Sequence, residues 1–354
     1  MIIPQVMKIS KRPAAPMMQI KNGQKKYIRN FISYFLGPLL FFWLSYSIYT
    51  QIQKQPDLQR SWQHISQSLN SPMIWNLAGV LLLMIVNWSI ETFKWKLCVQ
   101  KIQHVSFIVA FKAVLSGVSF SVTTPNRIGE YLGRVLYMNE GNRLKAISLT
   151  ITGSISQLII TLVMGLGGLL ILQQPIEKSG VISSFWLDAI LYGVLIGLLI
   201  LLFFYFKLSW LVKWIDRLPG VRRYAWLLQA LENFNATLLL QLLSLSTVRF
   251  FVFIIQYYLL FRLFGVEVSW WETWWAVSVS FLVMAIIPTI ALFTDLSLRG
   301  QVSLKLIGLF STNHLGIGLT SVSIWFINLI IPALAGSILI LSIKKFLRNK
   351  NERH

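Results

Sequence analysis

The sequence has very little acidic charge and almost no cysteine. Its 354 residues include only 12 Asp and Glu and a single cysteine, Cys98. One cysteine excludes an intrachain disulfide framework and a cysteine-rich metal site. The four histidines are scattered, without His-x-x-x-His or Glu-x-x-His spacing, so no metal ligand set is predicted. Nucleotide-binding loops and serine-hydrolase motifs are also missing, so we expect no cofactor, and ATP-driven transport and serine hydrolysis have no support.

Apolar residues dominate the chain instead. It is 55% hydrophobic and only 12% charged, about half the charge of a soluble domain. Several runs of more than 18 nearly uncharged residues are each long enough to cross the hydrocarbon layer as a helix. The 14 Trp and 11 Tyr residues, often at the ends of those runs, are typical of membrane interfaces. These features predict an all-α polytopic membrane protein.

The net charge of +20 arises from basic residues that lie between the apolar runs. That placement is typical of membrane orientation and of contact with anionic headgroups, so we expect no nucleic-acid partner. Residues 1–29 are predicted to be a disordered basic cytoplasmic tail without a cleavable signal peptide, because no apolar segment precedes Phe31. Residues 30–345 are predicted to form one membrane domain, and residues 346–354 a second basic cytoplasmic tail.

Six full spans are predicted, at about 31–52, 72–92, 146–172, 185–206, 237–264 and 319–343. The segments expected on one side of the membrane carry 25 lysines and arginines, and those expected on the other side carry three. The basic side is predicted to be cytoplasmic, with both termini there, in the cytoplasmic (inner) membrane. Six spans satisfy this only if 107–137 and 274–310 are re-entrant hairpins. The two halves, about 72–172 and 237–343, would then be an inverted-topology repeat.

The first hairpin contains a break at Thr123-Thr124-Pro125. Beyond it, Arg127, Glu130 and Arg134 have the spacing of one helical stripe. Charges at membrane depth are costly, which favours a stripe that faces protein or water and binds a lipid phosphate. The alternative is a solvated cytoplasmic helix face. Thr123, Thr124 and Asn126 are expected to satisfy backbone groups freed at the break, with direct ligand contact as the other interpretation.

The second hairpin breaks at Pro288, and Asp295 and Arg299 follow at a spacing of four residues. They are either part of a ligand site or a structural ion pair that secures a broken helix. Arg249 lies in the middle of the span 237–264, where an arginine is a functional candidate, and its expected partner is Asp295 or Glu130. We interpret the two breaks as two halves of one polar site within the membrane.

The segments Thr124-Pro-Asn-Arg-Ile-Gly-Glu130 and Ile287-Pro-Thr, the latter followed by Asp-Leu-Ser-Leu-Arg299, resemble the flippase-like membrane domain of lysylphosphatidylglycerol synthases. Pro125, Arg127, Gly129 and Glu130 match the first family pattern, and Asn126 stands in place of a glycine. Full-length members move an aminoacylated phospholipid between leaflets and carry a soluble aminoacyltransferase domain. The resemblance therefore implies a stand-alone membrane domain that handles a lipid without the synthase chemistry.

The leading hypothesis is a flippase for an anionic phospholipid or a polyprenyl-phosphate-linked lipid, not an enzyme. Arginines 127, 134, 249 and 299 would bind the lipid, with Glu130 and Asp295 as counter-charges. One alternative is an integral lipid-modifying transferase that uses Glu130 or Asp295 as a base. Another is a scaffold that recruits a cytoplasmic lipid-modifying enzyme, such as a glycosyltransferase, through the basic segment 207–235.

Overall fold

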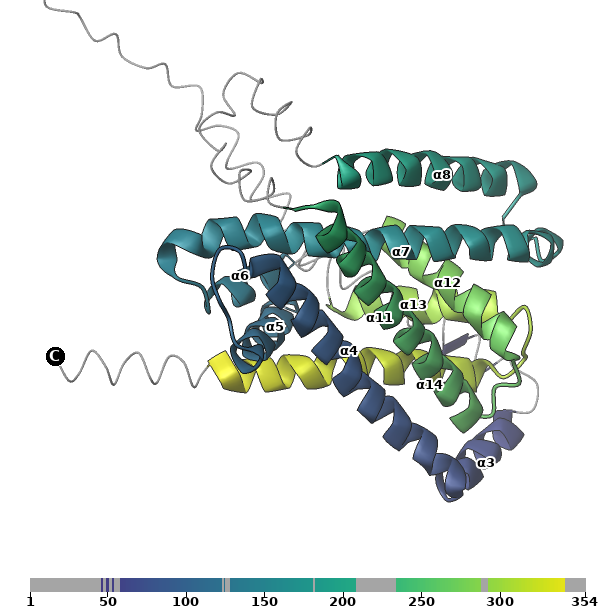
Figure 1. The fold of residues 1–354 in the computed structure, drawn as a ribbon. Coiled ribbons are helices and arrows are strands. Elements are labelled where there is room, and N and C mark those ends of the chain that lie inside the picture. The colour runs from purple at the N-terminus through teal and green to yellow at the C-terminus, as the bar shows by residue number, and fades with distance from the viewer. Residues whose placement is uncertain are drawn as a thin grey trace, which may run out of the picture.

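A computed structural model describes residues 58–122, 124, 128–180, 182–207, 234–287 and 292–340, together with positions 46, 49, 50 and 53. The described residues form helices and contain no strand (Figure 1). The main helices are α3 (Leu58–Leu69), α4 (Trp75–Val99), α5 (Phe107–Val122), α6 (Gly129–Val135), α7 (Arg143–Lys178), α8 (Ser184–Phe206), α11 (Ala236–Leu263), α12 (Trp270–Ile286), α13 (Leu292–Ile307) and α14 (His314–Trp325). The last helix continues through a π-helical turn, Phe326–Ile330, to residue 340.

Five of the described helices are long and apolar enough to cross a membrane: Pro72–Val99, Glu140–Lys178, Ser184–Phe206, Ala236–Leu263 and His314–Ile340. They correspond to five of the six predicted spans and confirm an all-α polytopic membrane protein. The predicted span at 31–52 and both predicted tails lie outside the described residues, apart from positions 46, 49 and 50.

Three predicted boundaries are wrong. Helix α4 continues seven residues beyond Thr92, and α7 continues six residues beyond Leu172, through Pro175. The last spanning helix begins at His314, five residues before the predicted start. The first difference arises because Glu91 and Lys94 pair with each other inside the protein and do not end the span at an interface. Lys94 is therefore buried inside the protein, at a position where the sequence pattern predicts the membrane surface.

The first predicted hairpin consists of α5 and the short helix α6, which pack closely against each other (Figure 1). Glycines allow this approach, since a Cβ on Gly133 would lie 2.5 Å from the Cα of Gly117, and one on Gly117 would lie 2.7 Å from the carbonyl oxygen of Glu130. Two backbones this close leave no room for side chains between them. The hairpin thus carries residues 130 and 134 inward, against α4.

The second predicted hairpin consists of α12 and α13, which also pack against each other. Ser269 and Glu272 form a capping box at the start of α12. Helix α12 ends as the backbone becomes extended at Ile287, as expected for a residue that precedes a proline. The break therefore lies where the sequence predicted it, although residues 288–291 are not described.

Each hairpin packs against a helix of the other half of the chain, where the halves are residues 75–178 and 236–340. A Cβ on Gly168 of α7 would lie 2.9 Å from the carbonyl oxygen of Trp275 in α12. A Cβ on Gly336, near the end of the chain's last described helix, would meet the carbonyl oxygen of Leu115 in α5. The first arm of each hairpin therefore packs against the last helix of the other half. The inverted-topology repeat itself stays a prediction.

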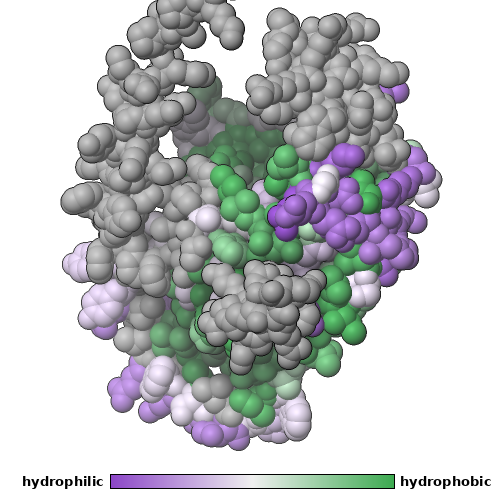
Figure 2. Space-filling model, turned by 90° about the vertical axis from the view of Figure 1, so that its left-hand side faces the viewer, coloured by the Kyte–Doolittle hydropathy of each residue, from purple (hydrophilic) through white to green (hydrophobic). Residues whose placement is uncertain are grey.

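Figure 2 shows the end of the molecule where α6 and the start of α7 lie. Hydrophilic side chains gather on one side of this end, beside apolar surface. Exposed polar residues near it include Lys101, Glu140 and Arg143. This is the end that the charge pattern assigns to the cytoplasm, an assignment that stays a prediction.

Candidate functional site

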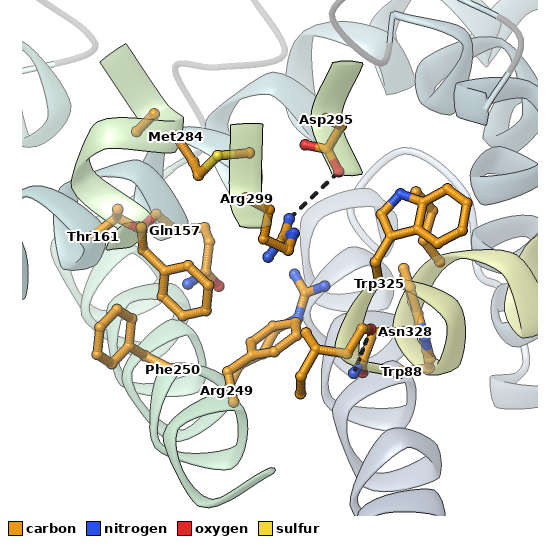
Figure 3. A pocket seen from close by; sticks show the side chains of 15 residues that line it. Trp88, Gln157, Thr161, Arg249, Phe250, Met284, Asp295, Arg299, Trp325 and Asn328 are labelled. Carbon is orange, nitrogen blue, oxygen red and sulfur yellow. Dashed lines mark hydrogen bonds and ion pairs between the residues drawn. The ribbon is translucent and has the colours of Figure 1, made fainter. Parts of the chain in front are cut away.

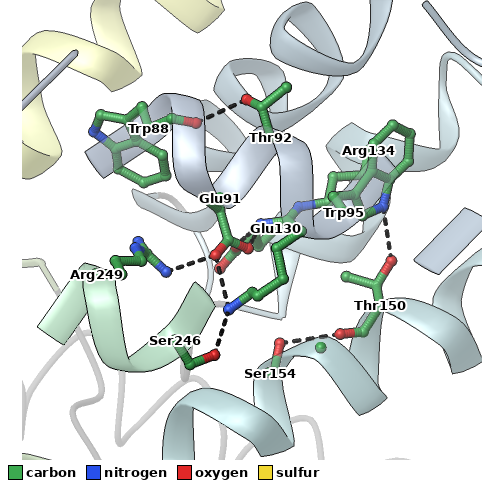
Figure 4. A network of polar contacts seen from close by, with 12 residues as sticks. Trp88, Glu91, Thr92, Trp95, Glu130, Arg134, Thr150, Ser154, Ser246 and Arg249 are labelled. Carbon is green, nitrogen blue, oxygen red and sulfur yellow. Dashed lines mark hydrogen bonds and ion pairs between the residues drawn. The ribbon is translucent and has the colours of Figure 1, made fainter. Parts of the chain in front are cut away.

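The candidate site is built around Glu91, an acid in α4 whose side chain is only 7% exposed. Three cations from three helices contact it: Lys94 of α4 at 3.0 Å, Arg134 of α6 at 2.9 Å and Arg249 of α11 at 2.7 Å (Figure 4). A lone buried carboxylate would be very costly, whereas one surrounded by hydrogen-bonded cations is stable. Glu91 thereby ties the first hairpin to the first helices of both halves.

Arg134 is buried, with 2% of its surface exposed, so the interpretation of a solvated cytoplasmic face is wrong for this residue. Its guanidinium forms ion pairs with Glu91 and with Glu130, one helical turn earlier in α6. The close approach of α5 and α6 at Gly133 places it there. Arg127, the third member of the predicted stripe, lies outside the described residues.

Arg249 lies at the middle of α11, as predicted, but its predicted partners are wrong. One guanidinium nitrogen, Nη1, donates to Glu91 Oε2 at 2.7 Å, and Nε donates to Asn87 Oδ1 at 2.7 Å. The guanidinium carbon also lies 5.4 Å from the centroid of a Trp88 ring, within cation–π range. All three partners belong to α4, so Arg249 joins the first helices of the two halves.

Asp295 and Arg299 form the ion pair that their spacing suggests, with Arg299 Nη2 3.5 Å from Asp295 Oδ2. A second guanidinium nitrogen of Arg299 donates to the hydroxyl of Tyr257 in α11 at 3.3 Å. The Nε of Arg299 is buried and has no hydrogen-bond partner among the described residues. Arg299 therefore retains capacity to bind an additional acceptor.

Thr124 fulfils the predicted backbone role at the first break. Its hydroxyl donates to the carbonyl oxygen of Phe120 at 3.1 Å and accepts from the amide of Gly129 at 2.7 Å. It therefore links the end of α5 to the start of α6. Thr123 and Asn126, for which the same role is predicted, lie outside the described residues.

Two neighbouring cavities lie beside these residues. The first, of about 300 Å³, is bordered by Arg249, Arg299 and Asp295 and has walls of aromatic rings (Figure 3). The second, of about 380 Å³, is bordered by Glu91, Glu130 and Lys94. Four residues line both cavities: Trp88, Gln157, Thr161 and Arg249. The residues that follow the two breaks thus border two adjacent cavities with shared walls, and their role in binding stays a prediction.

The charges around this region are not balanced. Its described cations are Lys94, Arg134, Arg249 and Arg299, and its described acids are Glu91, Glu130 and Asp295. One positive charge therefore has no counter-charge among them. Figure 3 shows the guanidinium groups of Arg249 and Arg299 pointing toward one another in the first cavity. Two partly buried cations that face each other repel, and an anion between them relieves that repulsion.

Sequence reasoning missed Glu91 and Asn87 as members of the site and took Lys94 for the end of a span. A signal was present, because positions 87, 91 and 94 share one helical face within an otherwise apolar run. The partner of Arg249 was harder to predict from the sequence, because Glu91 is 158 residues away in the chain. Proximity of that kind follows from the packing of α4 against α11.

Comparison with known families agrees with this architecture. The family described as Lysylphosphatidylglycerol synthase TM region matches residues 31–294. The chain belongs to this family. The match covers Glu91, both arms of the first hairpin and Arg249, and it ends one residue before Asp295. The matched range therefore includes the residues around Glu91, and it does not include the ion pair in α13. No individually curated protein matches the chain.

Proposed function

We propose that this family member is a flippase-like transporter whose substrate is an anionic phospholipid or a polyprenyl-phosphate-linked lipid. The observation that carries the proposal is the pair of facing guanidinium groups, Arg249 and Arg299, in an aromatic-walled cavity. Arginines bind phosphate through parallel hydrogen bonds with a geometry that suits its oxygens. The lipid's phosphate would lie between the two groups.

The charge balance supports a phosphate diester. Such a group carries one negative charge, which matches the one unbalanced positive charge among the described residues of the site. Asp295 and Glu130 act as counter-charges that limit the positive potential of the unoccupied site. Arg134 lines neither of the two cavities and acts by holding Glu91 and Glu130 in place.

The position of the site supports movement across a membrane. Arg249 is at the middle of a helix long enough to span it, and Arg299 and Glu130 belong to broken helices of opposite halves. Broken helices that meet at mid-membrane are typical of transporters that expose one site alternately to the two sides. In this proposal both termini are cytoplasmic, and the lipid leaves the protein chemically unchanged.

The test is lipid exchange in liposomes that contain fluorescent phosphatidylglycerol, read by quenching the outer leaflet. The wild type is expected to make both leaflets accessible to the quencher. Arg299→Gln should slow exchange roughly 10- to 100-fold, the value of one or two charge-assisted hydrogen bonds. Arg262→Gln is the matched control, because Arg262 is exposed at the end of α11. This variant should exchange lipid at the wild-type rate.

A double variant, Asp295→Asn with Arg299→Gln, separates binding from structure. If the pair only secures a broken helix, removing both charges together should restore exchange relative to Arg299→Gln. If Arg299 binds the phosphate, the double variant stays slow. Thin-layer chromatography of the lipid after the assay addresses the transferase alternative, since a modified headgroup would contradict transport alone. Wild-type protein that exchanges no phosphate lipid would refute the proposed function.

A further inference from the structure

Arg249 takes part in two interactions that differ in kind. Toward α4 it is bound by Glu91 and Asn87, each at 2.7 Å. Toward the first cavity its guanidinium faces Arg299 (Figure 3). The first interaction connects the two halves of the protein, and the second borders the space proposed for the ligand. One side chain is therefore shared between an internal contact and the site.

Glu91 does not depend on Arg249 alone. If Arg249 turned away, Lys94 at 3.0 Å and Arg134 at 2.9 Å would still neutralise the carboxylate (Figure 4). Arg249 has no such reserve, because Glu91 is the one acid within ion-pair distance of it among the described residues. If Arg249 left Glu91 without gaining another anion, a partly buried cation would lose its only ion-pair partner among the described residues, which is unfavourable. An arriving phosphate supplies that anion.

We propose that Glu91 is an internal counter-anion that competes with the ligand's phosphate for Arg249, so that binding breaks the ion pair between α4 and α11. This inference rests on the proposed function, and it adds a link between occupancy and movement. Without ligand, the pair from Arg249 to Glu91 holds the first helices of the two halves together. With ligand, Arg249 turns to the phosphate, and this link between the halves is lost while the hydrogen bond from Gln256 to the carbonyl oxygen of Val80 remains. The weaker contact between α4 and α11 then favours a change in the side on which the site opens.

Competition of this kind lowers the apparent affinity for the ligand by the fraction of time that Arg249 is free. If Arg249 is free about one-tenth of the time, removing the competitor should tighten binding roughly tenfold. The same change should slow exchange, because the contact no longer re-forms when the ligand leaves. Tighter binding with slower transport is the signature, and a loss of folding alone would not produce it.

The experiment compares Glu91→Gln and Glu91→Asp with the wild type. Purified full-length protein in detergent is titrated with dioctanoyl phosphatidylglycerol by calorimetry, and exchange is measured in liposomes. Glu91→Gln should bind roughly tenfold tighter and exchange lipid more slowly. Glu91→Asp keeps the charge but shortens the side chain, so it should show a smaller shift in both measurements. If Glu91→Gln does not fold, Glu91→Asp decides the question.

Glu140→Gln is the matched control, because Glu140 is exposed, pairs with Arg143 and lines neither cavity. Its affinity for the lipid should not rise. The inference is overturned if both Glu91 variants bind no more tightly than the wild type, or if Glu140→Gln tightens binding equally. A wild type that neither binds nor exchanges the lipid would overturn the proposed function itself. Exchange by the wild type with unchanged affinity in the Glu91 variants would overturn the competition only.

Discussion

Replacing Gly133 by alanine tests the close approach of α5 and α6. A Cβ at this position would lie 2.5 Å from both the Cα and the nitrogen of Gly117 and from the carbonyl oxygen of Ser116. All three atoms belong to the backbone, so no side-chain rotation can relieve the contact. Reaching an ordinary contact distance of about 3.4 Å requires the helices to separate by about 1 Å, and overpacking of this kind costs about 1–3 kcal/mol.

That cost corresponds to a fall of about 2–12 °C in the midpoint of thermal unfolding for a domain of a few hundred residues. The midpoint is measured by heating detergent-solubilised protein and recovering the folded fraction by size-exclusion chromatography. Gly193→Ala is the control, since a Cβ on Gly193 of α8 meets nothing within 4 Å. It should leave the midpoint unchanged or raise it slightly, as alanine is the better helix former. An equal midpoint for Gly133→Ala and the wild type would refute the packing described for this hairpin.

Two further predictions concern the buried face of α4. Cys98 is the single cysteine of the chain and is buried, so a membrane-permeant maleimide should label the native protein far more slowly than the denatured protein; equal labelling rates would contradict its burial. Trp95→Phe removes the hydrogen bond of 3.0 Å from the indole Nε1 to the hydroxyl of Thr150. It should destabilise the protein by about 1 kcal/mol, measured as a shift in the unfolding midpoint. Thr150→Val should lower the stability less in the Trp95→Phe background than in the wild type, because the hydrogen bond is already lost there.

Much of the fold could be predicted from the sequence because apolar length and proline breaks act locally. Five spans match the predicted ones, and the helix break before Pro288 lies where expected. The end of α4 could not be predicted, because whether Lys94 reaches the interface or stays buried depends on an acid one turn away and on the helix that covers both. Local hydropathy does not contain that information.

The candidate site was predictable in its parts but not in its connections. Asp295 and Arg299 are close in sequence, and helical spacing predicts their contact directly. The partner of Arg249 depends instead on how α4 and α11 pack. The burial of Arg134 depends on a backbone contact between glycines that charge spacing does not reveal. Long-range ion pairs within a membrane protein therefore have to be read from the packed structure.

The exchange of hairpins between the halves has a consequence for how this protein is assembled. Because Gly336 closes on the backbone of α5 and Gly168 on that of α12, each half completes the other's hairpin. A chain cut between α8 and α11 would yield two fragments. In each fragment the hairpin would lack the helix of the other half that packs against it. Neither fragment should persist alone in the cell, whereas the two produced together should rescue each other. The two halves are therefore expected to depend on each other for stability.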